Sequence, residues 1–368
     1  MFNLKKGCLR LTLEELRQAI DGIDDRIHDL LMERAQWVLK VGELKGRSVQ
    51  NPMFYRPERE AGIHRRLEAR HHGPLPVAAV HRVFREIISA SLNLEKSLSV
   101  VYLGPEATFT HQAAIKQFGS SFRMYPANTI HDVFHECEVG RADFGVTPVE
   151  SSAEGVVHHT LQRMADSPLR ICGEIYLPVV HTLLSRETGL ERIQTVFAHP
   201  QVLDQCRGWL AAHLPGVATK ETESTARSVL IARETPQSAA IAGVYAADAY
   251  GLNLLADHIQ DQAGNENRFL VLGRQVPSRS GTDKTCLMFS FSDQPGFLHK
   301  VLGIFAARGI NLSAIQSIPS RGKAWEYIFF LDFDGHLEDP EPALALAELA
   351  ATPGVDIKVF GSFPRPIQ

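Results

Sequence analysis

The N-terminal part of the chain contains no proline from Leu13 to about Lys45 and carries a regular apolar seam. The seam residues alternate at spacings of four and three, which is the period of one face of an α-helix. They are Leu16, Ile20, Ile23, Ile27, Leu30, Arg34, Trp37 and Val41. At about 1.5 Å per residue, this helix would be roughly 50 Å long, more than a small domain can cover with its own chain. A second copy of the chain is therefore the expected cover.

Local signals define the ends of this helix and the helices that follow it. Thr12 and Glu15 form the pattern of a capping box, and Gly46 is placed to end the helix. Two shorter helices are expected at about 57–70 and 77–98, separated by a His-His-Gly-Pro break. Because no strand pattern precedes residue 99, residues 10–97 are predicted to form an all-helical domain.

From Ser99 onward, short apolar runs alternate with helical stretches, which is typical of α/β folds. Strands are expected at residues 99–103, 144–148, 171–176, 179–185, 195–199, 239–242 and 269–273. Residues 273–284 are polar and rich in Ser, Gly and Pro, so they are predicted to be a linker. We therefore expect an α/β domain at residues 99–275.

The last part of the chain has its own order of elements. The predicted elements are strand 285–292, helix 296–308, strand 311–319, a turn at 321–323, strand 326–333, helix 342–352 and strand 355–360. The order βαββαβ predicts a ferredoxin-like domain at residues 285–363. A chain of 368 residues is long enough for these three domains.

Charge and cysteine content limit the possible partners. The formal net charge of −4 provides no overall positive field, so neither nucleic acid nor an anionic membrane is expected as a partner. The five cysteines are odd in number and far apart, which argues against a disulfide framework and favours a reducing cytoplasm. The pairs His71 with His72 and His158 with His159 lack a third ligand at metal spacing, so no metal is predicted.

Arg34 occupies a seam position where an aliphatic residue is expected. A guanidinium cannot lose its proton to reduce the cost of burial, so it needs an anion there. Lys45 follows about three helical turns later, on nearly the same side of the helix. Arg17 is rotated about 100° away, so it faces another surface and could serve a neighbouring chain. The third helix places Ser91 and Glu95 on its apolar face, so polar groups of two helices are expected to converge.

Residues 13–95 resemble the all-helical chorismate mutases through ELRQAIDGIDDRIHDLLMER, VGELK, YRPERE and FREIISASLNLE. The resemblance implies rearrangement of chorismate to prephenate in an interlocked homodimer. This unimolecular reaction can be accelerated by electrostatics and shape, so no nucleophile, metal or cofactor is expected. The pocket implied by the resemblance is lined by Arg34, Lys45, Arg59, Glu60, Ser91 and Glu95, with Arg17 reaching into the partner's pocket.

The carboxyl group of Glu95 would lie close to the ether oxygen of chorismate, where negative charge develops. As a carboxylate it would repel that charge, so we expect it to act in its protonated form. Mutase activity should then fall as the pH rises, and Glu95→Gln should flatten the pH profile.

Residues 99–273 resemble prephenate dehydratases through LGPEATFTHQAA, GVTPVESSAEGVV, AHPQVLDQC, ESTARSV and NENRFLVLG. The resemblance implies two α/β lobes, arranged as in periplasmic binding proteins, with prephenate in the cleft between them. The second lobe would span residues 178–258. The substrate-binding positions implied are Thr108, Glu150, Ser151, His199, Gln201, Ser224, Thr225 and Arg268.

Three positions depart from the dehydratase pattern. The family's Thr-Arg-Phe triplet, whose Thr is the donor to the departing hydroxyl, begins here with Asn267. The family's Asn after Pro-Val-Glu is Ser151, and the Ser before His199 is Ala198. An amide is a poor proton source, so these changes predict a dehydratase that is slow, altered or lost, with Asn267 at the catalytic position.

The C-terminal segment resembles an ACT domain, a regulatory module that binds amino acids between paired subunits. DQPGFLHKVLGIFAARGINLSAIQSIPSR and WEYIFFLDFDGH carry the resemblance. It implies phenylalanine, the pathway product, as effector. The family's Glu-Ser-Arg-Pro motif reads Gln-Ser-Ile-Pro here and ends in Ile318 and Pro319. The regulatory positions implied are Gly296, Asn311, Leu312, Gln316 and Ser317.

Two other interpretations remain open from the sequence. One keeps the mutase but treats residues 99–273 as a decayed or repurposed binding cleft. The other makes the whole chain a ligand sensor without turnover. For the C-terminal unit alone, a further alternative is that it is kept only for dimerisation. The seam cations argue against a sensor, because binding alone does not require such an organised cationic pocket.

Overall fold

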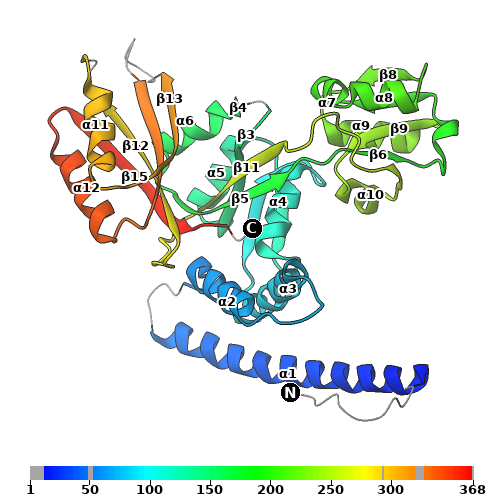
Figure 1. The fold of residues 1–368 in the computed structure, drawn as a ribbon, viewed down its shortest axis with the longest axis horizontal. Helices are drawn as coiled ribbons and strands as arrows, with labels where there is room; N and C mark the ends of the chain where they lie inside the picture. Colours follow the sequence, from blue (N-terminus) through cyan, green and yellow to red (C-terminus); the bar gives the residue numbers. More distant parts are fainter. Residues whose placement is uncertain (1–11, 49–52, 154, 292–293, 320–326, 367–368) are drawn as a thin grey trace.

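The structure is a computed structural model that describes residues 12–48, 53–153, 155–291, 294–319 and 327–366. The turn expected at residues 321–323, Cys8 and residues 10–11 of the predicted helical domain lie outside these ranges. Figure 1 shows a long helix at one side of the molecule, a pair of helices beside it, two α/β lobes and a C-terminal domain. The three kinds of domain predicted from the sequence are therefore present.

The N-terminal domain consists of α1 (Leu13–Ser48), α2 (Pro57–Ala69) and α3 (Val77–Glu95). The capping box is confirmed, because Thr12 Oγ1 accepts a hydrogen bond from the Glu15 N–H at 3.2 Å and the Glu15 carboxylate accepts one from the Thr12 N–H at 2.7 Å. Gly46 does not end α1, since glycine inside a helix costs only about 1 kcal/mol relative to alanine. Helix α3 ends three residues earlier than expected, because Lys96 is already extended toward the next strand.

The apolar seam of α1 is exposed in the single chain. Helix α1 packs against α3 and stands apart from the lobes (Figure 1). Ile20, Ile27 and Trp37 keep 56%, 50% and 60% of their surface exposed. A row of large apolar side chains along one long helix is typical of a surface that another protein covers.

The first lobe is built on a sheet of order β2-β1-β3-β11-β5, with β4 paired to β3. Its strands are β1 (Ser99–Leu103), β2 (Arg123–Ala127), β3 (Phe144–Ser151), β4 (Gly155–Val156), β5 (Arg170–Pro178) and β11 (Glu266–Gly273). Its helices are α4 (Phe109–Phe118), α5 (Ile130–Glu138) and α6 (His158–Asp166). Strand β11 lies antiparallel between β3 and β5, so a strand late in the sequence is inserted into the first sheet next to its edge strand β5.

The second lobe has the strand order β10-β6-β9-β7-β8. Its strands are β6 (Thr182–Ser185), β7 (Thr195–Ala198), β8 (Ala218–Glu221), β9 (Ser238–Ala242) and β10 (Asn253–Ala256). Its helices are η1 (Leu190–Arg192), α7 (Pro200–Gln205), α8 (Arg207–His213), α9 (Thr225–Glu234) and α10 (Tyr245–Tyr250). The apolar run predicted as one strand at 179–185 forms only the short β6, and β2, β8 and β10 were not predicted.

The C-terminal domain has the predicted order βαββαβ and an antiparallel sheet of order β13-β14-β12-β15. Its elements are β12 (Asp283–Phe291), α11 (Phe297–Ala306), β13 (Leu312–Pro319), β14 (Tyr327–Asp334), α12 (Pro340–Ala351) and β15 (Val355–Pro364). Edge strand β15 lies against β5 of the first lobe. Lys358 of β15 donates hydrogen bonds to the carbonyl oxygens of Ala165 and Ser167 at 2.8 and 2.6 Å.

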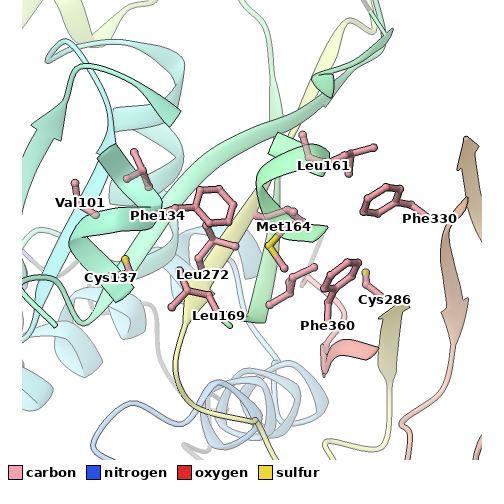
Figure 2. Packing of buried hydrophobic residues seen from close by; sticks show 14 of the residues in the cluster. Val101, Phe134, Cys137, Leu161, Met164, Leu169, Leu272, Cys286, Phe330 and Phe360 are labelled. Atoms are coloured by element: carbon pink, nitrogen blue, oxygen red, sulfur yellow. The ribbon is translucent and has the colours of Figure 1, made fainter. Parts of the chain in front are cut away.

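A hydrophobic core is shared between the first lobe and the C-terminal domain. Figure 2 shows Leu161 and Met164 of α6 facing Phe330 and Phe360 of the C-terminal sheet. Met164 and Phe360 are both 98% or more buried, at 1% and 2% exposure. The two domains therefore form one packed unit rather than two bodies on a loose linker.

The helical domain is anchored on the first lobe by Tyr55, in the segment before α2. Tyr55 is 2% exposed and packs its ring among Phe118, Phe122 and Phe144 of the first lobe. Its hydroxyl accepts a hydrogen bond from Gln117 Nε2 at 2.8 Å. The connection between α1 and α2 is thus fixed by a core that belongs to another domain.

Candidate active sites

The predicted mutase residues of α1 and α3 meet in one pocket. Lys45 Nζ lies 2.6 Å from Glu95 Oε2, and Arg34 donates a hydrogen bond to Ser91 Oγ. Ser91 in turn donates to the Ile87 carbonyl at 2.6 Å, which fixes its hydroxyl within α3. The sequence prediction that two helices bring these four polar groups together is confirmed.

Arg34 and Arg59 give this pocket a local excess of positive charge. Burial and the nearby charge of Arg59 lower the pKa of Arg34, while Glu95 opposes the shift. Like charges at one site repel each other unless an anion lies between them. The partly buried Arg34 and the exposed Arg59 are therefore suited to hold a ligand with carboxylates.

The pocket wall beyond Lys45 is formed by the segment that Tyr55 anchors. The Lys45 ammonium lies 3.5 Å from the Phe54 carbonyl oxygen and 5.5 Å from the centre of the Phe54 ring. Tyr55 follows directly and is held in the first lobe, so the lobe helps to position the lysine. Neither aromatic residue was predicted as part of the site, although Tyr55 begins the YRPERE stretch that carries the resemblance and Phe54 directly precedes it.

Glu60 of the pocket is backed by two buried histidines that sequence reasoning missed. Glu60 Oε1 lies 3.9 Å from His64 Nε2, and the His64 and His81 rings meet edge to face with centres 4.9 Å apart. His64 is 1% exposed, and neither of its ring nitrogens has a hydrogen-bond partner among the described residues. Burial lowers the pKa of His81. The spacing of His64 four residues after Glu60 was the only local signal.

Arg17 is exposed and does not contribute to the pocket of its own chain. It lies 17 residues before Arg34 on the same helix, which corresponds to about 25 Å along the axis. The predicted separation of Arg17 from the other cations is thus confirmed, whereas its place in a partner's pocket stays a prediction.

Several predicted dehydratase residues lie at the first turns of helices. Thr108 is the N-cap of α4 and accepts a hydrogen bond from the His111 N–H at 3.3 Å. Ser224 is the N-cap of α9 and accepts one from the Arg227 N–H at 3.2 Å. The remaining members are His199, the N-cap of α7, Gln201 in its first turn, and Thr225, the first residue of α9. Helix N-termini favour anions, so these positions are suited to carboxylates.

Asn267 and Ser151 come together on neighbouring strands. Residue 267 of β11 pairs with residue 151 of β3, and the Asn267 Oδ1 atom is buried without a hydrogen-bond partner among the described residues. An unpaired buried amide oxygen is costly unless a ligand or water satisfies it. The predicted catalytic position is therefore placed where a ligand could use it.

Arg268, a predicted substrate-binding residue, is paired with carboxylates of two domains. It is 8% exposed, its Nε donates to Glu174 Oε2 at 2.8 Å, and its Nη2 donates to Asp332 of the C-terminal domain. Burial by itself lowers the pKa of Arg268, but Asp332 and Glu174 more than reverse this, so the net pKa is raised. Glu150 Oε2 lies 3.8 Å from Nη1. A guanidinium already paired with carboxylates has little charge left for a substrate.

Lys284 completes this buried group of charges. Its Nζ lies 2.6 Å from Glu174 Oε1, and its side chain is 7% exposed. Glu174, Lys284 and Asp332 were missed by the sequence analysis. A partial signal existed for Glu174 and Asp332, because each lies within a mostly apolar strand next to large apolar residues, and a buried charge requires a partner.

The predicted regulatory residues lie at two places in the C-terminal domain. Gly296 precedes α11 with a φ of 77°, a left-handed conformation that favours glycine. Asn311 Nδ2 donates to Asp334 Oδ2 at 2.9 Å, just before Leu312 begins β13. Further along β13, Gln316 Nε2 donates to the Ser317 carbonyl at 3.2 Å.

Among the described residues, no three His, Cys, Asp or Glu side chains gather as they would around a metal ion. None of the helices in the described part of the chain is long and apolar enough to cross a membrane.

Comparisons with known proteins agree with this division of the molecule. Residues 16–96 match chorismate mutase type II, residues 100–277 match prephenate dehydratase, and residues 287–351 match the ACT domain. The bifunctional chorismate mutase/prephenate dehydratase of Aquifex aeolicus is 44% identical over 96% of this chain and 98% of its own. The chain belongs to the bifunctional chorismate mutase/prephenate dehydratase family.

A second relative and a solved structure are also similar to this chain. The bifunctional chorismate mutase/prephenate dehydratase of Pseudomonas aeruginosa is 40% identical over 96% of this chain and 98% of its own. A crystal structure of prephenate dehydratase from Arthrobacter aurescens in complex with L-Phe is 34% identical, with a TM-score of 0.66, and covers 73% of this chain and 90% of that one. The predicted fold class and both enzyme activities are thereby confirmed.

The enzyme therefore rearranges chorismate to prephenate in its helical domain and converts prephenate to phenylpyruvate in its two-lobed domain. Both reactions belong to the biosynthesis of aromatic amino acids, and the ACT domain indicates allosteric regulation.

Proposed function

We propose that Arg34 and Arg59 bind the two carboxylates of chorismate, while Lys45 and Glu95 face its ether oxygen. The observation that carries this proposal is the convergence of α1 and α3, where Arg34 donates to Ser91 and Lys45 lies 2.6 Å from Glu95. The nearby charge of Arg59, which lowers the pKa of Arg34 together with burial, agrees with an excess of positive charge there. The cations would hold chorismate in its reactive conformer, and Lys45 would stabilise the negative charge that develops on the ether oxygen. Ser91 orients Arg34, and Glu60 completes the pocket next to Arg59.

Glu95 is paired with Lys45 in the ligand-free pocket, at 2.6 Å. When chorismate enters, its ether oxygen would compete for the same ammonium group. Our prediction that Glu95 acts as a neutral acid applies to this ligand-bound state. The Glu95→Gln variant should keep its activity at high pH, where activity of the parent enzyme falls, and identical pH profiles for the two proteins would contradict this role.

We propose further that the enzyme is a homodimer held together by the apolar face of α1. Two copies of α1 that pair antiparallel about their midpoint would place Arg17 of one chain level with residue 44 of the other, next to Lys45. Each mutase pocket would then receive a third guanidinium from the partner. The exposed seam and the distance between Arg17 and Arg34 within one chain both favour this arrangement.

Two substitutions on α1 test the dimer. Ile27 lies on the seam and Met32 lies on another side of the helix, and they are similarly exposed at 50% and 49%. Ile27→Glu should convert the enzyme to a monomer in analytical ultracentrifugation and reduce mutase activity, because a buried unpaired carboxylate is costly. Met32→Glu should leave both unchanged. A dimer with full activity in Ile27→Glu would exclude this interface.

In the dehydratase cleft, we propose that prephenate is held by the N-terminal turns of α4 and α9 and by neutral side chains. The residues with this role would be Thr108, Ser151, His199, Gln201, Ser224 and Thr225. Asn267 would donate a hydrogen bond from its Nδ2 to the departing ring hydroxyl, while its buried Oδ1, which has no partner among the described residues, would accept one from the ligand or from water. Glu150 lies at the edge of this cleft, half-exposed.

We propose that phenylalanine is the effector of the ACT domain and that the enzyme works in the cytoplasm. Support for the effector comes from the L-Phe complex of the Arthrobacter aurescens dehydratase. Gly296, Asn311, Leu312, Gln316 and Ser317 are the proposed regulatory positions. Calorimetry with phenylalanine should give a binding isotherm that Asn311→Ala weakens and that Asn253→Ala, in the second lobe, does not. Equal binding by all three proteins would place the site elsewhere.

A further inference from the structure

Neighbouring residues on strand β11 face different domains. Phe269 and Val271 pack in a core cluster with Tyr102 and Phe144, whereas Leu270 and Leu272 pack in the cluster shared with the C-terminal domain. Since side chains of a strand alternate between its two faces, Asn267 lies on the face of Phe269 and Arg268 on the face of Leu270. The proposed catalytic position and Arg268 are thus adjacent in the chain but point in opposite directions.

The four buried charged residues at Arg268 come in equal numbers from the first lobe and the ACT domain. Arg268 and Glu174 come from β11 and β5 of the first lobe, while Lys284 and Asp332 come from β12 and β14 of the ACT domain. The set contains two cations and two anions. We call these four residues the bridging cluster. Removing Glu174 would leave Lys284 without an ion-pair partner among the described residues, and removing Arg268 would leave Asp332 without one, so the cluster ties the two domains together.

In the first lobe, Arg268 of the bridging cluster lies at the end of the strands that carry the cleft residues. Arg268 pairs with Glu150, and the register between β11 and β3 shifts immediately after this pair, where β3 has an extra residue at Val149. A bulge of this kind re-aims the side chains beside it. A displacement of Arg268 would therefore be passed directly to Asn267, Glu150 and Ser151.

The ACT side has room to move at this contact. A cavity of about 70 Å³ lies beside the cluster, lined by Arg268 and Asp332 together with Leu161, Phe330 and Gln316. At the opposite edge of the ACT sheet, β15 is held firmly, since Lys358 donates three hydrogen bonds to backbone oxygens of the first lobe. The ACT sheet is thus fixed to the first lobe at β15. At β13 and β14 it contacts the first lobe through the bridging cluster and borders the cavity.

We infer that Arg268 is a positioning residue of the dehydratase: Asp332 of the ACT domain holds its guanidinium and thereby sets the position of Asn267 in the cleft. The ACT domain is then a working part of the dehydratase even without effector. An effector that shifts β14 would change the cleft through the same contact. This regulatory part of the inference rests on the proposed binding of phenylalanine to the ACT domain.

The full-length variants Asp332→Asn and Asp332→Glu test this inference. Asp332→Asn removes the charge, and Asp332→Glu keeps the charge but displaces it by one methylene. Both should lower the dehydratase kcat for prephenate by about tenfold or more, because small misplacements of reacting groups reduce turnover strongly, while KM changes less than about threefold. Mutase activity, measured on the same polypeptide, should stay at the parent level and reports that the chain is folded.

Glu348→Gln is the matched control. Glu348 also pairs with an arginine of the ACT domain, at 2.6 Å from Arg308, but it lies on α12, outside the bridging cluster. The dehydratase kcat of Glu348→Gln should equal that of the parent enzyme. Parent values of kcat in both Asp332 variants would overturn the inference, as would a rise in KM alone, because that result would make Arg268 a substrate ligand. A parent kcat in Asp332→Glu with a reduced kcat in Asp332→Asn would show that charge balance, not position, is what matters.

Phenylalanine titrations separate this inference from the proposed regulation. If the parent enzyme is inhibited, Asp332→Asn should bind phenylalanine in calorimetry but respond at least fivefold less in dehydratase activity, a typical size of allosteric coupling. An unchanged response would overturn the regulatory part. If the parent enzyme binds no phenylalanine, the proposed effector is wrong, and the kcat values of the Asp332 variants still decide the role of Arg268.

Discussion

The mutase pocket and the bridging cluster hold arginine in opposite electrostatic settings. Arg34 lies near another guanidinium, and burial and this neighbour lower its pKa, whereas the carboxylates around Arg268 raise the pKa of that residue. Among the described residues, Arg34 forms no ion pair, whereas Arg268 pairs with Glu174 and Asp332 and lies 3.8 Å from Glu150. A cation with an unbalanced charge is suited to bind a ligand, and a cation with a balanced charge is suited to hold domains together.

The largest effect that this comparison predicts concerns stability at Arg268. Arg268→Ala leaves Glu174 and Asp332 buried near a single remaining cation, so the free energy of unfolding should fall by about 3–5 kcal/mol. Denaturant unfolding followed in the lobe and ACT part would measure it. The double variant Arg268→Met with Asp332→Leu removes one charge of each sign and should recover most of the loss. Equal instability of the single and double variants would show that the charges are not balanced as described.

Substitution of Arg34 should have the reverse consequence. Arg34→Ala should lower the mutase kcat/KM by about 100- to 1,000-fold, the usual cost of losing one preorganised donor to a developing charge, with little change in stability. Prephenate turnover by the same protein should be unaffected. The exposed Arg66 of α2 offers a control, since Arg66→Ala should leave the mutase rate unchanged. A destabilised Arg34→Ala with normal mutase activity would reverse our assignment of the two arginines.

The helical domain was largely predictable because its signals are local. The seam, the capping box and the distance from Arg34 to Lys45 all depend on the repeat of one helix, and the structure keeps them. The bridging cluster was not predictable, because residues 174, 268, 284 and 332 meet only after two sheets have packed together. Strand β8 was missed for another reason: Ala218–Glu221 is exposed at every position and has no apolar pattern.

A smaller effect is expected at the cleft itself. Asn267→Thr supplies a hydroxyl where the amide now stands, so prephenate turnover should rise by about ten- to a hundredfold, as a better proton donor assists the departing hydroxyl. Phenylpyruvate formation from added prephenate measures this directly, and mutase activity serves as the internal control. A rate that stays equal or falls would mean that Asn267 does not limit the reaction.

The smallest effect concerns pH. Burial lowers the pKa of His181 below the usual 6.5 of histidine, and it does the same for His81 and His111. The unfolded chain therefore takes up protons below about pH 6.5 before the folded chain does. The stability that these histidines contribute should be fully present above this pH and should be lost as the pH falls through their lowered pKa values.

The variant His181→Gln isolates one of these contributions. His181 is 2% exposed and its ring nitrogen lies 2.6 Å from Gln205 Oε1. Thermal unfolding between pH 5 and 7.5 should depend less on pH in His181→Gln than in the parent enzyme, while the exposed His213→Gln should match the parent. The same pH dependence in all three proteins would exclude His181 as a source of acid sensitivity.

The most direct test of two catalytic sites in one chain is a product-resolved time course. Purified full-length enzyme is incubated with chorismate, and chorismate, prephenate and phenylpyruvate are measured separately. We predict that prephenate appears first and then declines as phenylpyruvate forms. Prephenate that accumulates without phenylpyruvate would contradict the dehydratase activity, and chorismate that is not consumed would contradict the mutase.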